Sequence, residues 1–406
     1  MVDVTESVHR EKAHVLPLDS IRGIAATSVV IHHLLLMPTF LAAFPHNAWI
    51  DCSFFRSAWL LVDLFFVLSG IVMSLSYVDG DFGRFSLREF MWRRLARVYP
   101  LHIAMLAANL LFRLLRIGLV MAGIVIAAPA AFEVNNSYSF VLNVFLLHSM
   151  GFIDYLSWNA PSWSISVEFY TYLAFALVVM LAQRMRSLSL FYVLSGLVAV
   201  GSLAVIVFVL DKKSLGLQTD FGILRCFVSF FLGVLTVKVV HALPGKPGPA
   251  VQGAVQLVAM MASIVLVSVV EDYPAASFLA PLTFSIFLGS LLAFPDAMLV
   301  PRMLVVKPLV WLGKRSYSIY MVHALVVLFA EYFVRAVGAR RIAELDSVVP
   351  GLPATLNLVV ALAAVFVVSH YTYRYIEIPG GKFLRNLFGS RSDFPAASAP
   401  SARLTN

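Results

Sequence analysis

One stretch decides the fold of this chain: residues 19–33 read DSIRGIAATSVVIHH and open an apolar run that ends near Met37. Arg22 and His33 are eleven residues apart, which is close to three helical turns, so both side chains project from one face. They are separated by about 16 Å along the helix axis. Asp19 lies near the start of the same face. The stretch therefore predicts a membrane-spanning helix with one ionisable face.

Ionisable side chains inside a bilayer are costly, at about 2.5–3.5 kcal/mol on the insertion scale, so they usually face a cavity or the bundle interior. For this helix alone a structural interpretation is sufficient. In that interpretation Arg22 reaches toward the interface and His33 is a hydrogen-bonded core histidine. Polar residues inside later apolar runs favour a functional interpretation instead.

The composition indicates an α-helical membrane protein. Of 406 residues, 60% are hydrophobic and 13% are charged, and the mean hydropathy is +0.88, whereas soluble proteins carry about 25% charged residues. Repeated long apolar runs predict transmembrane helices. The net charge of +8 reflects basic loops that set topology and does not indicate nucleic acid. Two cysteines, Cys52 and Cys226, make neither a disulfide framework nor a metal site.

The apolar runs predict an all-α polytopic bundle of about ten spans with both termini cytoplasmic. Residues 98–150 are counted as one span, because a second span there would place the downstream basic loops outside. We divide the chain into a cytoplasmic segment at 1–15, a transmembrane domain at 16–380, and a cytoplasmic tail at 381–406 whose composition predicts disorder. The other predicted spans are 17–37, 59–77, 163–181, 189–210, 222–240, 251–270, 275–294, 316–337 and 355–376.

Two carboxylates lie inside predicted spans. Asp63 could pair with Arg22 or with His33, and a carboxylate that accepts an imidazole N–H fixes its tautomer and raises its basicity. An ion pair that only joins two helices explains the same spacing equally well. Glu168 follows a helix start at Pro161 and has no charged residue at i±3 or i±4. It therefore needs a partner on another helix, and it is a functional-site candidate.

Arg93 and Arg97 lie at i and i+4 on one predicted helix face. Two guanidinium groups there could hold phosphates with paired hydrogen bonds. Arginines beside a membrane more often set topology and touch lipid head groups, so the functional interpretation needs the other motifs. His323 could complete the polar cluster or only hydrogen-bond between helices. Glu377 is interpreted as structural and tied to a basic loop.

Taken in order, these segments resemble the membrane-bound acyltransferase-3 family. The resemblance covers residues 18–379, and six motifs in family order make it specific, although the residues after Glu168 depart from the family pattern. The motifs are LDSIRGIAA at 18–26 with His33, VDLFFVLSG at 62–70, RRxxRxxP at 93–100, WSISVE at 163–168, GxxSYSxYxxH at 313–323 and ExP at 377–379.

The resemblance implies an O-acyltransferase of the bacterial inner membrane that uses acyl-CoA, most simply acetyl-CoA, as donor and needs no metal. The acceptor would be a hydroxyl of a cell-surface or exported carbohydrate or of a glycolipid. Membrane lipids are the other expected contact, and the oligomeric state stays open. So does the question of whether the acyl group crosses the membrane.

The resemblance also implies roles for individual residues. His33 would be the general base or a transient acyl carrier. Arg22 and Asp63 would orient His33 or the donor, and Glu168 would help to position the acceptor or a proton path. The pair Arg93 and Arg97 would bind coenzyme A phosphates at the cytoplasmic face.

A second class of function could use the same polar cluster. A proton-coupled transporter or flippase of a polysaccharide precursor would use intramembrane ionisable residues as a proton relay. Such a protein would move the precursor across the membrane without forming a covalent product and without depending on coenzyme A. A third class is an inactive relative that only assembles with export machinery, and the intact polar residues weigh against it. These residues are Arg22, His33, Asp63 and Glu168.

Overall fold

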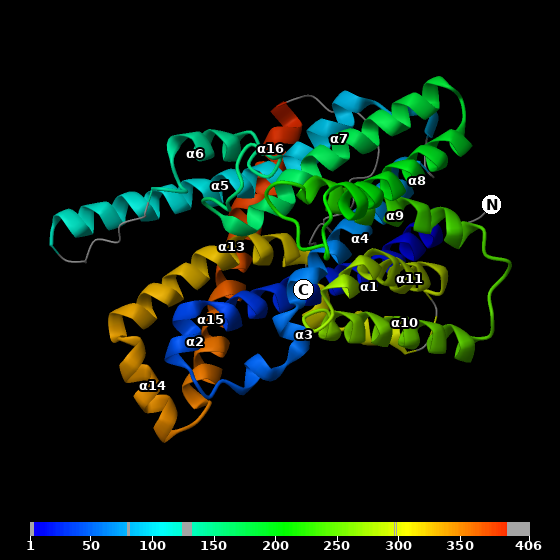
Figure 1. The fold of residues 1–406 in the computed structure, drawn as a ribbon. Coiled ribbons are helices and arrows are strands. Elements are labelled where there is room, and N and C mark those ends of the chain that lie inside the picture. Colours follow the sequence, from blue (N-terminus) through cyan, green and yellow to red (C-terminus); the bar gives the residue numbers. More distant parts are fainter. Residues whose placement is uncertain (1–3, 79–81, 124–131, 296, 298, 388–406) are drawn as a thin grey trace, which may run out of the picture.

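The computed structural model describes residues 4–78, 82–123, 132–295, 297 and 299–387, and every regular element among them is helical (Figure 1). Nine helices in this part of the chain, taken with the helical turns beside them, are long and apolar enough to cross a membrane. They are α4 (Leu61–Tyr77), α5 (Leu87–Met121), α7 (Trp163–Arg184), α8 (Leu188–Ala204), α9 (Gly222–His241), α10 (Pro249–Val269), α11 (Ala280–Ala293), α13 (Lys307–Val337) and α15 (Leu352–Thr372).

The predicted bundle of about ten spans is confirmed. The nine helices coincide with nine predicted spans, and α1 (Val4–Leu36) occupies the tenth position, the first in the chain. Helix α1 is not among the nine, because Asp19, Arg22 and two adjacent histidines make it less apolar. The region 98–150 contributes one membrane-length helix, α5, followed by the short α6 (Ser137–Val144).

Several boundaries differ from the predicted ones. Helix α1 begins at Val4, so residues 4–15 are helical and continue into the first predicted span. Helix α5 begins at Leu87, which places the basic residues from Arg88 to Arg97 on a helix and not in a loop. The first part of the predicted tail belongs to α16 (Ile378–Leu387), and the tail from residue 388 onward lies outside the described residues.

Helix α1 lies in the middle of the bundle (Figure 1) and packs against α4, α11, α13 and α15. Its position follows from its sequence, because Ala25, Ala26, Val29 and Val30 are buried on it. The shorter elements that connect the long helices are α2 (Pro38–Ala43), η1 (Ala48–Asp51), α3 (Ser53–Arg56), η2 (Ala58–Leu60), η3 (Phe82–Arg84), η4 (Ala160–Ser162), η5 (Val205–Val209), η6 (Pro274–Leu279), α12 (Val300–Leu304), α14 (Ala339–Val348) and η7 (Tyr373–Glu377).

Two close helix crossings depend on glycine. At the first, a Cβ on Gly23 or on Gly313 would overlap the backbone of the other helix, so α1 and α13 touch backbone to backbone. At the second crossing, a Cβ on Gly70 of α4 would overlap the backbone of α9, and a Cβ on Gly233 of α9 would overlap the backbone of α4. Small residues allow this approach in membranes, where packing rather than hydrophobic exclusion joins helices. The crossings therefore fix which residues of each helix pair face one another.

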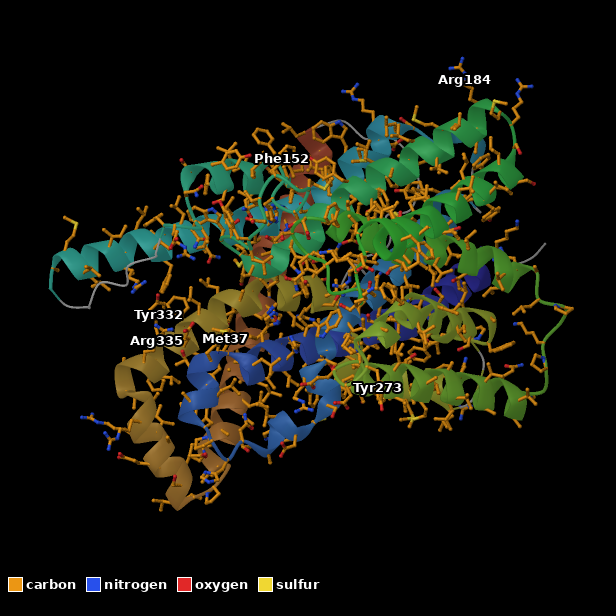
Figure 2. The ribbon with its side chains drawn as sticks, in the orientation of Figure 1. Met37, Phe152, Arg184, Tyr273, Tyr332 and Arg335 are labelled. Atoms are coloured by element: carbon orange, nitrogen blue, oxygen red, sulfur yellow. The ribbon has the colours of Figure 1, made fainter. Side chains whose placement is uncertain are left out.

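Helix α5, with 35 residues, is the longest α-helix in the described part of the chain. Its C-terminal part extends away from the bundle in Figure 1 and carries exposed apolar side chains, including Leu111, Leu115 and Met121. Figure 2 shows Arg184, at the end of α7, and Arg335, near the end of α13, at opposite ends of the bundle. The two helices thus end on opposite sides, as the ten-span scheme requires.

The first prediction concerns the crossing of α1 and α13. Gly313→Ala should destabilise the protein by about 1–3 kcal/mol, because the added methyl group overpacks a backbone contact. The measurement is thermal unfolding in detergent. Gly253→Ala is the matched control, since nothing lies within 4 Å of a Cβ at that helical position. Equal melting temperatures for the two variants would contradict the importance of the crossing.

Candidate active site

His33 lies near the C-terminal end of α1, half-buried, on the side that faces α13. Its Nδ1 is 2.9 Å from the carbonyl oxygen of Val29. A carbonyl oxygen only accepts, so Nδ1 carries the proton, and in the neutral ring Nε2 has a free lone pair. The local helix thus sets the tautomer that a general base requires, without help from a carboxylate.

His323 of α13 faces His33, with the ring centroids 4.9 Å apart. The contact follows from the glycine crossing, because each histidine is ten residues beyond its glycine, Gly23 or Gly313, on helices that run in parallel. His323 is completely buried, and its Nδ1 is 2.6 Å from the carbonyl oxygen of Tyr320. The structure therefore brings the predicted histidines of two distant motifs together.

Tyr320 connects this histidine pair to the start of α7. Its hydroxyl donates to the carbonyl oxygen of Pro161 at 3.1 Å and accepts from Ser164 Oγ at 3.0 Å. Its ring lies 5.6 Å from that of His323 and 5.9 Å from that of Phe65 on α4. Tyr320 thus joins α4, α7 and α13 beside His323, the ring that contacts His33.

Glu168 has the interhelical partner that its sequence context required. One of its carboxylate oxygens accepts hydrogen bonds from Ser69 of α4 at 2.5 Å and from Tyr172, one turn further along α7, at 2.6 Å. The carboxylate is half-buried and not sealed in the core. Arg94 of α5 lies over the ring of Tyr172 at 5.8 Å, so a cation is next to this hydrogen-bonded pair.

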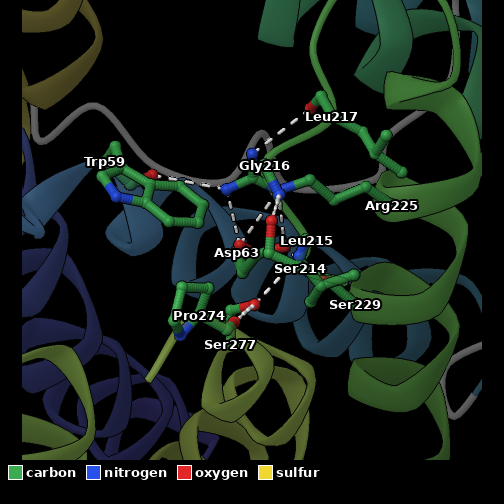
Figure 3. A network of polar contacts seen from close by, with 10 residues as sticks. All are labelled: Trp59, Asp63, Ser214, Leu215, Gly216, Leu217, Arg225, Ser229, Pro274 and Ser277. Atoms are coloured by element: carbon green, nitrogen blue, oxygen red, sulfur yellow. Dashed lines mark hydrogen bonds and ion pairs between the residues drawn. The ribbon is translucent and has the colours of Figure 1, made fainter. Parts of the chain in front are cut away.

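Asp63 pairs with neither Arg22 nor His33, so that expectation is wrong. The partner is Arg225 of α9, whose Nε and Nη2 donate to the carboxylate at 2.7–3.1 Å (Figure 3). Ser229 donates to the same carboxylate at 2.8 Å. The side chains of Asp63 and Arg225 both have an exposed fraction of 0%. The close approach of α4 and α9 at their glycines turns Asp63 toward α9 and away from α1.

Arg225 satisfies its remaining donors nearby. It donates to the carbonyl oxygens of Leu217 and Trp59, each at 3.3 Å (Figure 3). Its guanidinium lies 5.1 Å from the ring of Trp59 and 5.4 Å from that of Trp163. Arg225 is not among the site residues predicted from the sequence. Its signal in the sequence is an arginine inside the predicted span 222–240, since an ionisable residue in a span is a functional-site candidate whether it is basic or acidic.

The three predicted arginines each have an acidic partner. Arg22 contacts Asp19 at 3.0 Å, one turn away on α1, and both side chains are about a quarter exposed. Arg93 pairs with Glu89 on α5. Arg97 of α5 pairs with Glu377, which also accepts from Ser318 of α13 at 2.6 Å.

Glu377 therefore has a structural contact with the basic segment of α5. The glycines that follow it support this contact, since Gly380 packs against Pro100 and Gly381 against Ala96. The side chain of Arg97 is still 47% exposed while Glu377 is almost fully buried. Part of the Arg97 side chain therefore stays accessible beside its ion pair with Glu377.

The fold and these side chains define a polytopic helical membrane protein with ionisable groups in its interior. Among the described residues, no three His, Cys, Asp or Glu side chains are close enough to hold a metal ion. The sequence profile of the acyltransferase-3 family, described as an acyltransferase domain, matches residues 16–374. The chain therefore belongs to the acyltransferase-3 family.

Curated relatives agree with this assignment. O-acetyltransferase OatA of Staphylococcus aureus (strain NCTC 8325 / PS 47) is 24% identical over 379 residues, which cover 89% of this chain and 56% of OatA. A protein of Staphylococcus aureus (strain COL) that is provisionally named as an O-acetyltransferase is 24% identical over 390 residues, covering 91% of this chain and 58% of the relative. This chain thus spans less than two thirds of either relative. No solved structure matches it.

The second prediction concerns the pair Asp63–Arg225. Asp63→Asn should destabilise the protein by about 3–5 kcal/mol, because it leaves a buried guanidinium without its counter-charge. Replacing both partners, with Asp63→Leu and Arg225→Met, should cost less than the sum of the single changes. Thermal unfolding in detergent measures all variants. Glu344→Gln, in the exposed pair with Arg340, is the control and should change stability by less than about 1 kcal/mol. Additive losses in the double variant would contradict the pairing.

Proposed function

We propose that this protein is an integral-membrane O-acyltransferase of the bacterial inner membrane. It moves an acyl group, most simply an acetyl group, from acyl-CoA to a hydroxyl of a cell-surface or exported carbohydrate. The observation that carries the proposal is His33, half-buried against His323 of α13, with Nδ1 bonded to the carbonyl of Val29, which leaves the lone pair of Nε2 for proton transfer. Membership of the acyltransferase-3 family over residues 16–374 supports it.

In the proposed reaction Nε2 of His33 takes the proton of the acceptor hydroxyl. The hydroxyl oxygen attacks the thioester carbonyl carbon and forms the new ester bond, and the carbon–sulfur bond breaks. The proton passes from His33 to the departing thiolate, which leaves as free thiol. A positioned base contributes about 10²–10⁴-fold to such a step. His323 lies against the ring of His33 and would hold it in place.

The arginines would bind the anionic part of the donor. Arg22 and His33 lie on one continuous helix, separated by about 16 Å along its axis, which suits an elongated thioester with a charged end and a reactive end. Arg93 and Arg97 of α5 would add contacts to phosphate groups. Because Arg97 is 47% exposed, a phosphate can approach it while Glu377 stays in place.

Glu168 and Asp63 receive different roles. Glu168 is half-buried and held by Ser69 and Tyr172, so its carboxylate would accept a hydrogen bond from the acceptor substrate. Asp63 is fully enclosed with Arg225, so we assign it a positioning role that keeps α4 and α9 aligned beside the site.

The third prediction tests the base. His33→Ala should reduce transfer of labelled acetyl groups from acetyl-CoA to the glycan fraction of membranes by about 10²–10⁴-fold. His32→Gln, at the adjacent position, is the matched control and should retain most of the activity, since Gln can still donate to the carbonyl of Phe55. Undiminished acetyl transfer by a well-inserted His33→Ala variant would contradict the proposal. Transmembrane flux of a glycan without any labelled product would favour the transporter class.

The fourth prediction tests donor binding. Arg97→Gln should raise the KM for acetyl-CoA by about tenfold or more, because a hydrogen bond to a charged group contributes about 1.5–3 kcal/mol. Arg88→Gln, an exposed position on the same helix, is the control and should leave the KM unchanged. The rate at saturating donor should change much less than the KM. An equal effect of both substitutions would argue against a specific phosphate contact.

A further inference from the structure

A cluster of buried hydrogen-bond acceptors lies beside the candidate active site. Four of the buried acceptor atoms that have no hydrogen-bond partner in the described part of the chain are His102 Nδ1, Asn143 Oδ1, Asn159 Oδ1 and His323 Nε2. We call these atoms the acceptor cluster. They come from α5, α6, the connection between α6 and η4, and α13, and their residues are between 0% and 2% exposed.

The chemistry of the cluster is fixed by the bonds that its residues already make. Each of the four side chains uses its N–H group on a backbone carbonyl oxygen, which can only accept. The atom that remains is therefore a lone-pair acceptor in every case. The four bonds are His102 Nε2 to Asn143 (2.8 Å), Asn143 Nδ2 to Ser139 (2.8 Å), Asn159 Nδ2 to Met321 (3.1 Å) and His323 Nδ1 to Tyr320 (2.6 Å).

Polar contacts connect the two ends of the cluster. Ser162 Oγ donates to the carbonyl oxygen of Asn159 at 2.7 Å and lies 3.1 Å from His148 Nε2. The ring of His148 stacks on that of His102, with centroids 5.8 Å apart and planes within 6°. Burial, and next the neighbouring His102, lower the pKa of His148 to about 3, so this ring is neutral at neutral pH. The connection is therefore polar but uncharged.

Such a cluster calls for a ligand that donates hydrogen bonds. A buried acceptor without a donor costs about 1–3 kcal/mol, so four of them would be a large fraction of the stability of a protein. An anion has no proton to give, and an apolar group would leave the cost unchanged. Water donates two hydrogen bonds, accepts others, and is the usual partner of buried polar groups that have no protein partner.

We propose that ordered water molecules bind the acceptor cluster and form a hydrogen-bonded path from His323, which contacts His33, to His102 on α5. This inference goes beyond acyl transfer, since it concerns a ligand site that exists without substrate. The water next to His323 would also complete the hydrogen bonding of the ring that packs against His33.

The test is radiolytic hydroxyl labelling of the intact protein in lipid nanodiscs, without any acyl donor. Bound water generates hydroxyl radicals beside buried side chains, so Met321 should be oxidised several-fold faster than Met73. Both methionines are buried in apolar clusters, at 0% and 2% exposed, but the backbone carbonyl oxygen of Met321 accepts a hydrogen bond from Asn159 of the acceptor cluster. Equal rates at the two positions would overturn the proposal, whatever the acyltransferase assay shows.

A matched pair of variants sharpens the test. Asn159→Leu keeps the side-chain size and removes the central acceptor, so oxidation of Met321 should fall to the rate of Met73. Asn109→Leu removes a buried asparagine whose Nδ2 donates within α5, to the carbonyl of Met105, and should leave Met321 unchanged. A correctly folded Asn159→Leu with undiminished labelling would overturn the proposal. If this variant fails to insert, the comparison within the wild-type protein still decides.

Discussion

The ion pair between Asp63 and Arg225 is the constraint on which the rest of the bundle depends. Two charges with no solvent exposure persist only because every neighbour is arranged to meet them, including a serine, two carbonyl oxygens and two tryptophan rings. The pair joins α4 to α9 and, through Trp163, to the start of α7. The side chains with proposed chemical roles, His33 and Glu168, are by contrast half-buried. The fixed pair supports residues that remain accessible.

Much of the fold could be predicted from the sequence. Hydropathy and loop charge gave the all-α bundle, the number of spans and the single span within 98–150, because a bilayer forces backbone polar groups into helices. Part of the site also followed from sequence. The spacing of Arg22 and His33 placed both on one helix. The lack of a charged residue one turn away from Glu168 predicted a partner on another helix, and Ser69 is that partner, although Tyr172 of the same helix also donates to the carboxylate.

The missed features depend on how helices face one another. Asp63 could be assigned a partner only by knowing that α4 crosses α9 at glycines, and periodicity within one helix does not contain that information. The acceptor cluster was missed for a related reason. The segment 145–159 has no periodic pattern, and its buried asparagine and histidine side chains resemble those of an ordinary polar loop until the structure shows their surroundings.

The length of α5 has a consequence for the lipid around the protein. Its 35 residues rise about 52 Å, whereas the hydrocarbon core of a bilayer is about 30 Å thick. The basic first part of the helix, with Arg88, Arg93 and Arg97, is not apolar, so α5 extends beyond the hydrocarbon core at that end. Arg113, near the extended end, lies over the ring of Trp158, which belongs to the same segment as Asn159. The depth of α5 in the bilayer is thereby linked to a contact of Trp158, next to Asn159.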